Sequence, residues 1–486
     1  LEAGDRLGGA LRTAQFAGGQ VDVGPDGFLG RRPEAVALCR ELGLEGELEP
    51  IGSSGAAVWA RGRLRTLPAG LALGVPTRFW PVATSGILGP AGSLRLLADA
   101  VVPRPDLRRP MGDRALGPLL ERKLGHRVVE ALADPMIGGI HAGSVVDMST
   151  AANFPLLLAV SQGRGGLMRN LRRALARGAR PDTTALDLVE PAGTDPADRG
   201  AGNNRGARDE QPSPAFWAMR NGMGSLVDGL SHALRGRGVE LRTGAAVINL
   251  VRTDARGIPW SVQTSSGELL SADGIVLATP APSTASLLAD LDSDASAVLR
   301  GIQHASVGIV TLSYSPQAFP SPLEGTGLLV PKRGERPRSR AAAGDFLVTA
   351  CTFLSIKWPH LARGGQVLIR ASVGRFGDQR FVELDDDTLV QRVIDELGVL
   401  LEVSEAHSEA TVTRWIDAFP QYQVHHLLRV AAVEAAAGRL PGLAVAGRTY
   451  RGVGIPACIA SGRAAARRVL DALDGPTDHP GAKILQ

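Results

Sequence analysis

Hydrophobic and polar positions alternate along much of the chain with the periods of strands and amphipathic helices. The alternation predicts a hairpin over residues 59–67 and strands over 239–250, 258–265, 274–280, 307–314, 346–354, 366–373 and 442–446. A period near that of an α-helix predicts helices over 38–48, 225–234, 388–401 and 458–473. A β-rich middle between two α/β ends indicates an α/β plus α+β fold whose domains are interleaved in sequence.

Residues 83–180 depart from this pattern, because they read as helices rich in Leu, Ala and Arg. This stretch holds 14 Lys+Arg against 7 Asp+Glu, a larger surplus than the net charge of +4 of the whole chain. We therefore predict a basic helical domain over residues 83–178. Residues 179–217 are dominated by Pro, Asp, Gly, Asn and Arg without apolar periodicity, which predicts a disordered insertion, and residues 475–486 read as a tail.

Composition narrows the class of protein. The chain has 486 residues, too many for one ordinary core, and its 44% hydrophobic and 21% charged residues are typical of globular proteins. No apolar run approaches the roughly 18 residues that a membrane-spanning helix needs. Only 4% of the residues are aromatic and no recognisable nucleic-acid motif occurs, so a nucleic-acid partner is not expected. The widely separated Cys39, Cys351 and Cys458 form neither a disulfide framework nor a metal set, which favours a reducing compartment.

Two glycine-rich segments carry the candidate chemistry. Glu2 is followed by Arg6, Gly8 and Gly9, and an acid at the end of a strand in a dinucleotide fold accepts hydrogen bonds from ribose hydroxyls. The alternative is an ordinary solvated acid in a loop. Residues 447–462 run from a strand through several glycines into a helix, whose N-terminus would stabilise negative charge on a reduced flavin. The alternative there is a plain strand-turn-helix connection, which needs fewer glycines.

Six blocks in the same order resemble the FAD-dependent protoporphyrinogen/coproporphyrinogen oxidase family, within the glutathione-reductase and amine-oxidase group. They are residues 2–9, 24–28 (Gly-Pro-Asp-Gly-Phe), 221–226 (Asn-Gly-Met-Gly-Ser-Leu), 356–359 (Ile-Lys-Trp-Pro), 414–422 and 453–456 (Val-Gly-Ile-Pro).

The resemblance implies a glutathione-reductase-like FAD-binding domain assembled from residues 1–52, 218–282 and 436–474. It also implies a mixed-sheet substrate domain from residues 53–82 and 283–435. The implied FAD contacts are Glu2, Ala3, Ala10, Gly24, Pro25, Asp26, Gly27, Val247, Trp415, Val453, Gly454 and Ile455. No catalytic side chain and no metal are expected, because the flavin N5 performs the redox chemistry. We expect FAD to be bound non-covalently.

The substrate implied by the resemblance is a tetrapyrrole, oxidised in three two-electron steps with O2 as the final acceptor. Asp26 stands where eukaryotic protoporphyrinogen oxidases have an arginine, which favours coproporphyrinogen III and the bacterial coproporphyrin-forming branch of haem biosynthesis. Protoporphyrinogen IX oxidation, another flavin amine oxidase-like or carotenoid-desaturase activity, and a non-catalytic scaffold stay open as alternatives.

The remaining predictions concern location and single residues. The protein is expected in the cytoplasm, and its basic helical domain either meets an anionic membrane surface or haem-pathway enzyme, or is a soluble Arg-rich face. Because Glu2 normally follows a Gly-x-Gly-x-x-Gly loop by about 20 residues, we expect the first strand and that loop to be encoded upstream of Leu1. Lys357, beside Trp358, resembles the lysine near flavin N5 in amine oxidases, but we interpret it as a strand-end surface residue. For His425 and His426, partly exposed structural histidines are favoured over the alternative of catalytic bases, and His141 is expected in the wall of the substrate cavity.

Overall fold

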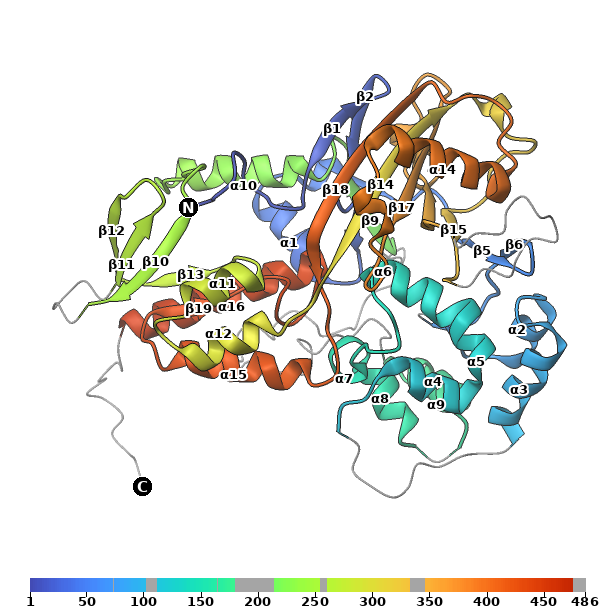
Figure 1. The fold of residues 1–486 in the computed structure, drawn as a ribbon, viewed down its shortest axis with the longest axis horizontal. Helices are drawn as coiled ribbons and strands as arrows, with labels where there is room; N and C mark the ends of the chain where they lie inside the picture. Colours follow the sequence, from blue (N-terminus) through green and yellow to red (C-terminus); the bar gives the residue numbers. More distant parts are fainter. Residues whose placement is uncertain are drawn as a thin grey trace, which may run out of the picture. The chain divides into compact units, whose positions relative to one another are not determined.

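Both folded units of the protein are assembled from separated stretches of the chain. The computed structural model describes residues 1–72, 74–101, 112–163, 165–179, 214–253, 260–332 and 346–474. Unit 1 consists of residues 1–9, 231–303 and 427–486, and unit 2 consists of residues 10–230 and 304–426 (Figure 1). Most of the predicted insertion at 179–217 lies outside the described residues.

A mixed seven-stranded sheet forms the centre of unit 2. Its strand order is β18-β14-β17-β16-β15-β5-β6, and every pair is antiparallel except β15 with β5. The strands are β18 (Glu409–Pro420), β14 (His304–Tyr314), β17 (Val367–Val373), β16 (Val348–Phe353), β15 (Gly327–Leu329), β5 (Ala57–Ala60) and β6 (Arg63–Thr66). The sheet confirms the predicted mixed-sheet character.

Helix α14 (Asp386–Leu401) covers one side of this sheet. Its apolar face packs Leu389, Val393 and Leu397 against strand side chains such as Val310 and Ile369. Asp385 begins the helix because its side chain accepts a 2.8 Å hydrogen bond from the Thr388 amide, and acidic residues follow in the first turn. Covered in this way, β14 is buried at every position after His304.

Unit 2 also contains the helices predicted for the basic stretch. They are α2 (Phe79–Thr84), α3 (Gly89–Val101), α4 (Leu116–Leu124), α5 (His126–Val128), a π-helix (Val129–Gly138), α6 (Gly139–His141), α7 (Thr150–Asn153), α8 (Pro155–Ser161) and α9 (Leu167–Ala176). Leu96, Leu120 and Leu132 form part of their common core. The Asp99 carboxylate caps α9 by accepting hydrogen bonds from the Leu167 and Met168 amides. Within the described ranges, every helix is too short or too polar to cross a membrane.

Smaller elements complete unit 2. They are β1 (Thr13–Phe16), β2 (Gly19–Asp22), β3 (Phe28–Leu29), α1 (Pro33–Glu41), β4 (Leu48–Pro50), β7 (Leu71–Ala72), β8 (Val75–Pro76), β9 (Phe216–Met219), α13 (Leu354–Lys357) and the start of α10 (Gly224–Gly236). Short 3-10 turns occur at Glu45–Glu47, Pro316–Ala318, Pro359–Leu361 and Arg380–Glu383. The helix predicted over 38–48 is wrong in its bounds, because Pro33 starts α1 and Gly43 adopts a positive φ of 72° after it.

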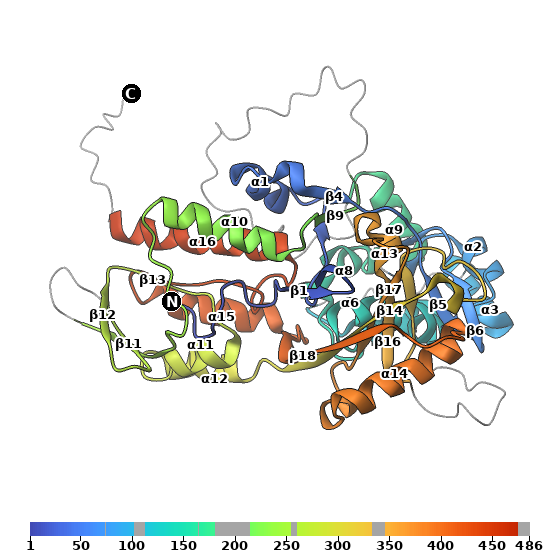
Figure 2. The ribbon, with the colours of Figure 1, turned by 90° about the horizontal axis from the view of Figure 1, so that it is seen from above.

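Unit 1 pairs a short parallel sheet with an antiparallel one. β13 (Ile275–Leu277) is parallel to β19 (Leu443–Val445), while β10 (Val247–Arg252), β11 (Trp260–Thr264) and β12 (Leu269–Ala272) form an antiparallel meander. The helices are α11 (Ala281–Leu287), α12 (Ser293–Arg300), α15 (His426–Gly438) and α16 (Ile455–Asp474), which Figure 2 shows from a second side. The strand predicted over 239–250 is wrong before Val247, because Gly244 turns the chain with a φ of 65°.

Candidate functional site

The predicted site residues divide between the two units. Unit 1 carries the segment around Glu2, the start of β10 and the turn before α16, whereas unit 2 carries the residues from Ala10 to Gly27 together with Trp415.

In unit 1, the segment around Glu2 and the chain leading to Val247 lie side by side. The Glu2 amide donates to the Arg242 carbonyl at 2.8 Å, and the Ala245 amide donates to the Glu2 carbonyl at 2.9 Å. One carboxylate oxygen of Glu2 accepts a 2.8 Å hydrogen bond from the Gly4 amide. This bond fixes the side chain and leaves the carboxylate further acceptor capacity. The structure thus brings Glu2, Ala3 and the start of β10 together.

The glycines that follow Glu2 leave their backbone open. Gly8 and Gly9 have φ values of 98° and 54°, in the region that favours glycine. A Cβ added at Gly9 would meet no atom within 4 Å, so the peptide there is accessible to a ligand. Arg6 is held over this turn by a 2.8 Å hydrogen bond from its guanidinium to the Gly9 carbonyl.

The turn from β19 into α16 carries the other predicted residues of unit 1. The Gly447 amide donates to the Ser461 hydroxyl at 3.1 Å, which ties the turn to the helix. A Cβ at Gly454 would meet only the Pro456 ring, at 3.9 Å, so the backbone just before the helix is also open. Because α16 begins at Ile455 and has 20 residues, its first turn presents amide groups and the positive end of the helix dipole.

In unit 2, Gly24 lies in close contact with two other predicted residues. A Cβ at Gly24 would collide with the Ala10 carbonyl oxygen and lie 3.6 Å from the Trp415 ring. The Trp415 indole donates to the Val23 carbonyl at 2.8 Å, and the Arg370 guanidinium donates to the Gly24 carbonyl at 2.9 Å. The glycine requirement here is therefore steric, and strands β17 and β18 fix the backbone of the loop.

Asp26 is the buried centre of a charge cluster. Its carboxylate accepts hydrogen bonds from the Lys357 ammonium at 2.9 and 3.1 Å and from the Trp358 indole at 3.0 Å, and Arg370 lies 3.5 Å away. Burial alone would raise the pKa of Asp26, but the charges of Arg370 and Lys357 outweigh it and hold the pKa well below its ordinary value. Asp26 is therefore ionised and paired.

The structure places Lys357 differently from the sequence-based prediction. It ends α13 rather than a strand, its side chain is only 17% exposed, and its charge is matched by Asp26. The prediction of a strand-end surface residue is wrong, because the partner lies on a loop far away in sequence.

A second buried carboxylate was missed by sequence reasoning. Asp22 accepts hydrogen bonds from the Thr13 hydroxyl at 2.6 Å and from the Met223 amide at 2.8 Å, and Thr13 in turn accepts one from the Gly224 amide. Desolvation raises the pKa of Asp22 to about 6, although the hydrogen bonds oppose this. The Gly-Met-Gly block at 222–224 is thus held by two β-hairpin residues, and no local pattern signals the pairing.

The three histidines singled out in the sequence differ in burial. The His426 ring is fully buried and stacks on Tyr422 with centroids 3.8 Å apart, so the expectation of partial exposure is wrong for His426. His425 is exposed in a left-handed conformation with a φ of 71°. Burial lowers the pKa of His141, whose Nδ1 lies 3.0 Å from the Ile137 carbonyl oxygen.

Comparisons with known proteins cover nearly the whole chain. The family model of flavin-containing amine oxidoreductases matches residues 1–470. A coproporphyrinogen III oxidase from Propionibacterium freudenreichii is 35% identical over 97% of this chain and 86% of its own length. One from Bacillus subtilis is 29% identical over 97% of this chain and 91% of its own length.

A solved structure from Exiguobacterium sp. 255-15, described as a protoporphyrinogen oxidase, has the same fold. Its TM-score is 0.78 at 28% identity, and the alignment covers 98% of this chain and 92% of that one. Together these matches confirm the predicted resemblance, the flavoprotein fold with mixed sheet and helices, a flavin-dependent oxidoreductase activity and FAD as the cofactor.

Proposed function

The chain belongs to the flavin-containing amine oxidoreductases, and from this premise we propose that it oxidises coproporphyrinogen III to coproporphyrin III in haem biosynthesis. The observation that carries the proposal is the 35% identity to a coproporphyrinogen III oxidase over 97% of the chain. When bound, FAD supplies the oxidising power, accepting hydride equivalents from the substrate before O2 takes up the electrons.

Unit 1 offers groups that fit the adenosine and pyrophosphate parts of FAD, as expected for a glutathione-reductase-like domain. Glu2 retains acceptor capacity for ribose hydroxyls, the open backbone at Gly9 admits a diphosphate, and Val247 follows the segment that pairs with Glu2. The first turn of α16, after the open Gly454, stabilises a neighbouring negative charge. Burial raises the pKa of the Cys458 thiol, which favours non-covalent attachment.

Glu2 can be tested against a matched neighbour. Glu2→Gln removes the charge-assisted contact to ribose and should weaken FAD affinity about tenfold, whereas Asp5→Asn, at an exposed position in the same segment, should leave it unchanged. Titration of the apoprotein with FAD, followed by flavin fluorescence, measures both affinities. Equal affinities of the two variants would remove Glu2 from the FAD site.

For unit 2, we propose separately that residues 24–27 and Trp415 contact the isoalloxazine ring. Asp26 and Arg370 hold this loop through the Lys357 pair and the Gly24 carbonyl, so its peptides are preorganised. Pro25 and Gly27 flank the ion pair, and a Cβ at Gly27 would meet the Trp217 carbonyl at 2.6 Å. The loop's contribution is position and shape, and we assign no proton-transfer role to it.

The choice of substrate is tested by turnover of two porphyrinogens. The purified full-length protein, loaded with FAD and supplied with air, should give a higher kcat/KM with coproporphyrinogen III than with protoporphyrinogen IX, followed by porphyrin fluorescence. Coproporphyrinogen carries four propionates rather than two, and the net charge of +4 favours the more anionic ligand. Protoporphyrinogen IX is the second candidate substrate, because the similar Exiguobacterium structure is described as a protoporphyrinogen oxidase. A kcat/KM for protoporphyrinogen IX at least as high as that for coproporphyrinogen III would favour this second activity.

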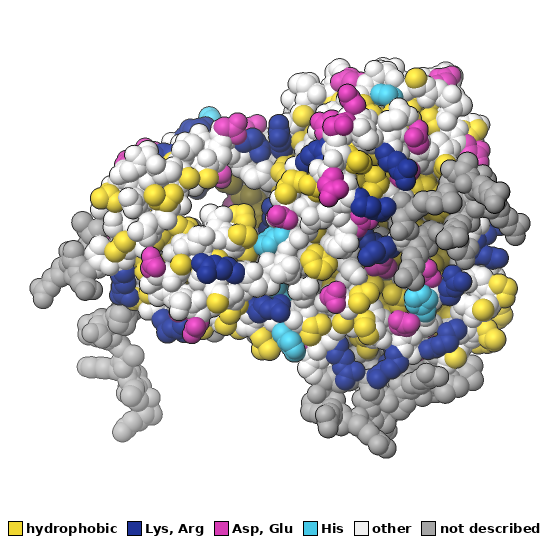
Figure 3. All heavy atoms as spheres, viewed as in Figure 1, with side chains coloured by type: hydrophobic (Ala, Val, Ile, Leu, Met, Phe, Trp, Pro, Cys, Tyr) yellow, Lys and Arg dark blue, Asp and Glu magenta, His cyan; other side chains and the backbone are white. Residues whose placement is uncertain are grey.

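We further propose that the helical part of unit 2 meets an anionic membrane surface without crossing the bilayer. Arg169, Arg172 and Arg173 are exposed on α9, while Trp80 and Leu94, on the packed helices α2 and α3, are 73% and 71% exposed. Figure 3 shows basic side chains at the lower edge of this helical part. Each basic group near an anionic surface contributes about 1 kcal/mol. Sedimentation with vesicles should depend on anionic lipid and salt, and a salt-independent result would favour a soluble face.

A further inference from the structure

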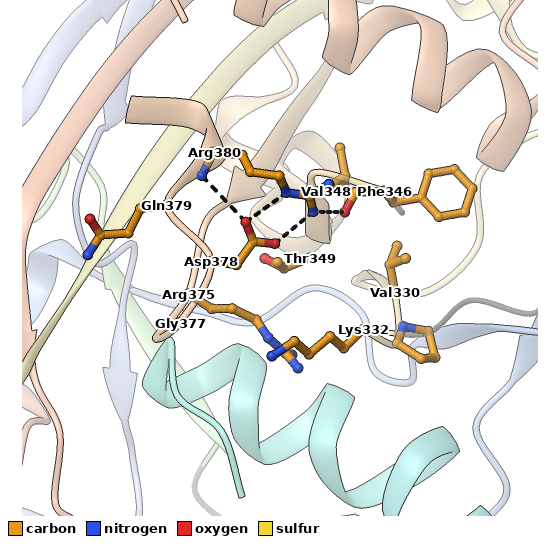
Figure 4. A pocket seen from close by; sticks show the side chains of 11 residues that line it. Val330, Lys332, Phe346, Val348, Thr349, Arg375, Gly377, Asp378, Gln379 and Arg380 are labelled. Carbon is orange, nitrogen blue, oxygen red and sulfur yellow. Dashed lines mark hydrogen bonds and ion pairs between the residues drawn. The ribbon is translucent and has the colours of Figure 1, made fainter. Parts of the chain in front are cut away.

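A pocket in unit 2 lies at the end of β17, away from the Asp26 cluster. Its volume is about 340 Å³, and its walls come from the chain after β15, the start of β16 and the turn after β17. Phe346, Val330 and Val348 supply apolar surface, while Lys332, Arg375 and Arg380 supply positive charge (Figure 4). Such a lining suits a ligand that joins an apolar body to an anionic end.

Arg375 is positioned by its backbone and by one buried ion pair. It begins a tight turn in which its amide donates to the Asp378 carbonyl at 3.1 Å and its own carbonyl accepts from the Asp378 amide at 2.8 Å. Its guanidinium is paired with the Asp134 carboxylate at 2.5 Å, in a space that Gly138 leaves open by having no side chain. The residue is only 3% exposed, yet its Nε lacks a hydrogen-bond partner among the described residues. An anion that enters the pocket would accept a hydrogen bond from this unused donor of the buried guanidinium.

The charges around the pocket do not cancel. Asp378 is bound by Arg380 through hydrogen bonds of 2.8 and 2.7 Å, and Asp134 matches Arg375. Lys332 is exposed and has no ion-pair partner within the described ranges, so these residues leave one positive charge unmatched. Figure 4 shows the Lys332 and Arg375 side chains pointing toward each other from opposite sides of the pocket. An anion bound between these two positive side chains would be attracted by both.

We propose that this pocket binds a propionate carboxylate of the tetrapyrrole substrate, with Lys332 and Arg375 holding the carboxylate and Phe346 and Val330 flanking its apolar arm. The proposal rests on the proposed function. Strand β17 links the pocket to the loop at Gly24, because Arg370 contacts that loop and lies five residues before Arg375. From Arg370 to the end of β17 at Val373 the strand spans roughly 10 Å at about 3.3 Å per residue, and Arg375 lies in the turn beyond it. The pocket would therefore hold an outer substituent of a ligand whose ring reaches the loop.

Lys332 can be tested by single substitutions, because the residue is exposed and removal of its charge should not affect folding. Lys332→Gln should raise the KM for coproporphyrinogen III about fivefold with kcat nearly unchanged, in proportion to one partly exposed ionic contact. Lys332→Arg should restore the wild-type KM, and the effect should shrink as salt is added. Arg63→Gln, an equal charge loss at an exposed position of β6, is the matched control and should have the wild-type KM.

Arg375 requires a paired change, because Arg375→Gln alone leaves the Asp134 charge without its partner. The double variant Arg375→Gln/Asp134→Asn removes both charges of the pair and should raise the same KM about tenfold if the protein keeps its melting temperature within a few degrees. If the double variant is instead unstable, the Lys332 series decides the question alone.

Equilibrium binding separates failure of the subsite from failure of the proposed function. Coproporphyrin III should quench the protein's tryptophan fluorescence with a Kd about fivefold higher for Lys332→Gln than for wild type, whereas its tetramethyl ester should bind both proteins equally. A KM and a Kd for Lys332→Gln equal to those of Arg63→Gln would overturn the subsite, even with an active wild-type enzyme. If the wild type turned over neither porphyrinogen, the proposed function would be wrong. The difference in binding between coproporphyrin III and its tetramethyl ester would still test the subsite.

Discussion

Removing the charge of Asp26 should destabilise unit 2 more than any other single polar substitution proposed above. Asp26→Asn keeps the shape of the side chain and an acceptor for Trp358, but it leaves Lys357 and Arg370 charged with side chains only 17% and 12% exposed. Breaking a buried pair from one side costs about 3–5 kcal/mol, and we expect the lower figure because the lysine retains some access to water. The double variant Asp26→Asn/Lys357→Met should recover at least about 1 kcal/mol of this loss.

Urea denaturation of the FAD-loaded protein, followed by circular dichroism, measures these free energies of unfolding. The low pKa of Asp26 means that its stabilisation is present above the unfolded value near 4 and is lost as the pH falls toward the folded value. The difference between wild type and Asp26→Asn should therefore be full at pH 7 and fade below about pH 4. A loss under about 1 kcal/mol at pH 7, or additive effects of the two substitutions, would refute the assignment of Asp26 as the charge partner.

Three further substitutions test the neighbouring contacts. Desolvation raises the pKa of Asp22 from 3.8 to about 6, so the wild type should lose roughly 2 kcal/mol of stability as the pH rises from 4 to 7. Asp22→Asn should lack this loss in urea titrations at both pH values. Thr13→Val removes the hydroxyl between Asp22 and the Gly224 amide and should lower the free energy of unfolding by about 1–3 kcal/mol, measured in the same way. Gly24→Ala forces a Cβ against the Ala10 carbonyl and should cost about 1–3 kcal/mol and reduce the bound FAD, read from the flavin absorbance per protein; normal occupancy would contradict the steric argument.

The parts of the fold that follow from local pattern could be predicted from the sequence. Helix α14 lies within two residues of its predicted start and at its predicted end, because its apolar period and its Asp385 cap are both local signals. The bounds of α1 could have been found as well, since Pro33 and Gly43 mark them.

Contacts between distant segments could not be predicted in the same way. The pairing of Asp26 with Lys357 and the capture of Met223 by Asp22 depend on tertiary packing, and neither changes the periodicity of its own segment. Both Gly24 and Gly454 belong to glycine-containing motifs of the sequence, but only the tertiary structure distinguishes the steric need at Gly24 from the open backbone at Gly454. Arg375 gave no signal at all, because an arginine after a strand is usually solvated.

The parallel pairing of β13 with β19 has a consequence for how the protein is made. Ile275 must find Leu443, and the whole of β14 to β18 is synthesised between them. Long loops close slowly, so unit 1 cannot complete its parallel sheet until nearly the entire chain has left the ribosome. During that interval the apolar strand β13 lacks its partner strand β19, so we expect chaperones to bind the nascent chain. Pulse-chase proteolysis of stalled nascent chains should show unit 1 becoming protected only when stalling lies well beyond Val445.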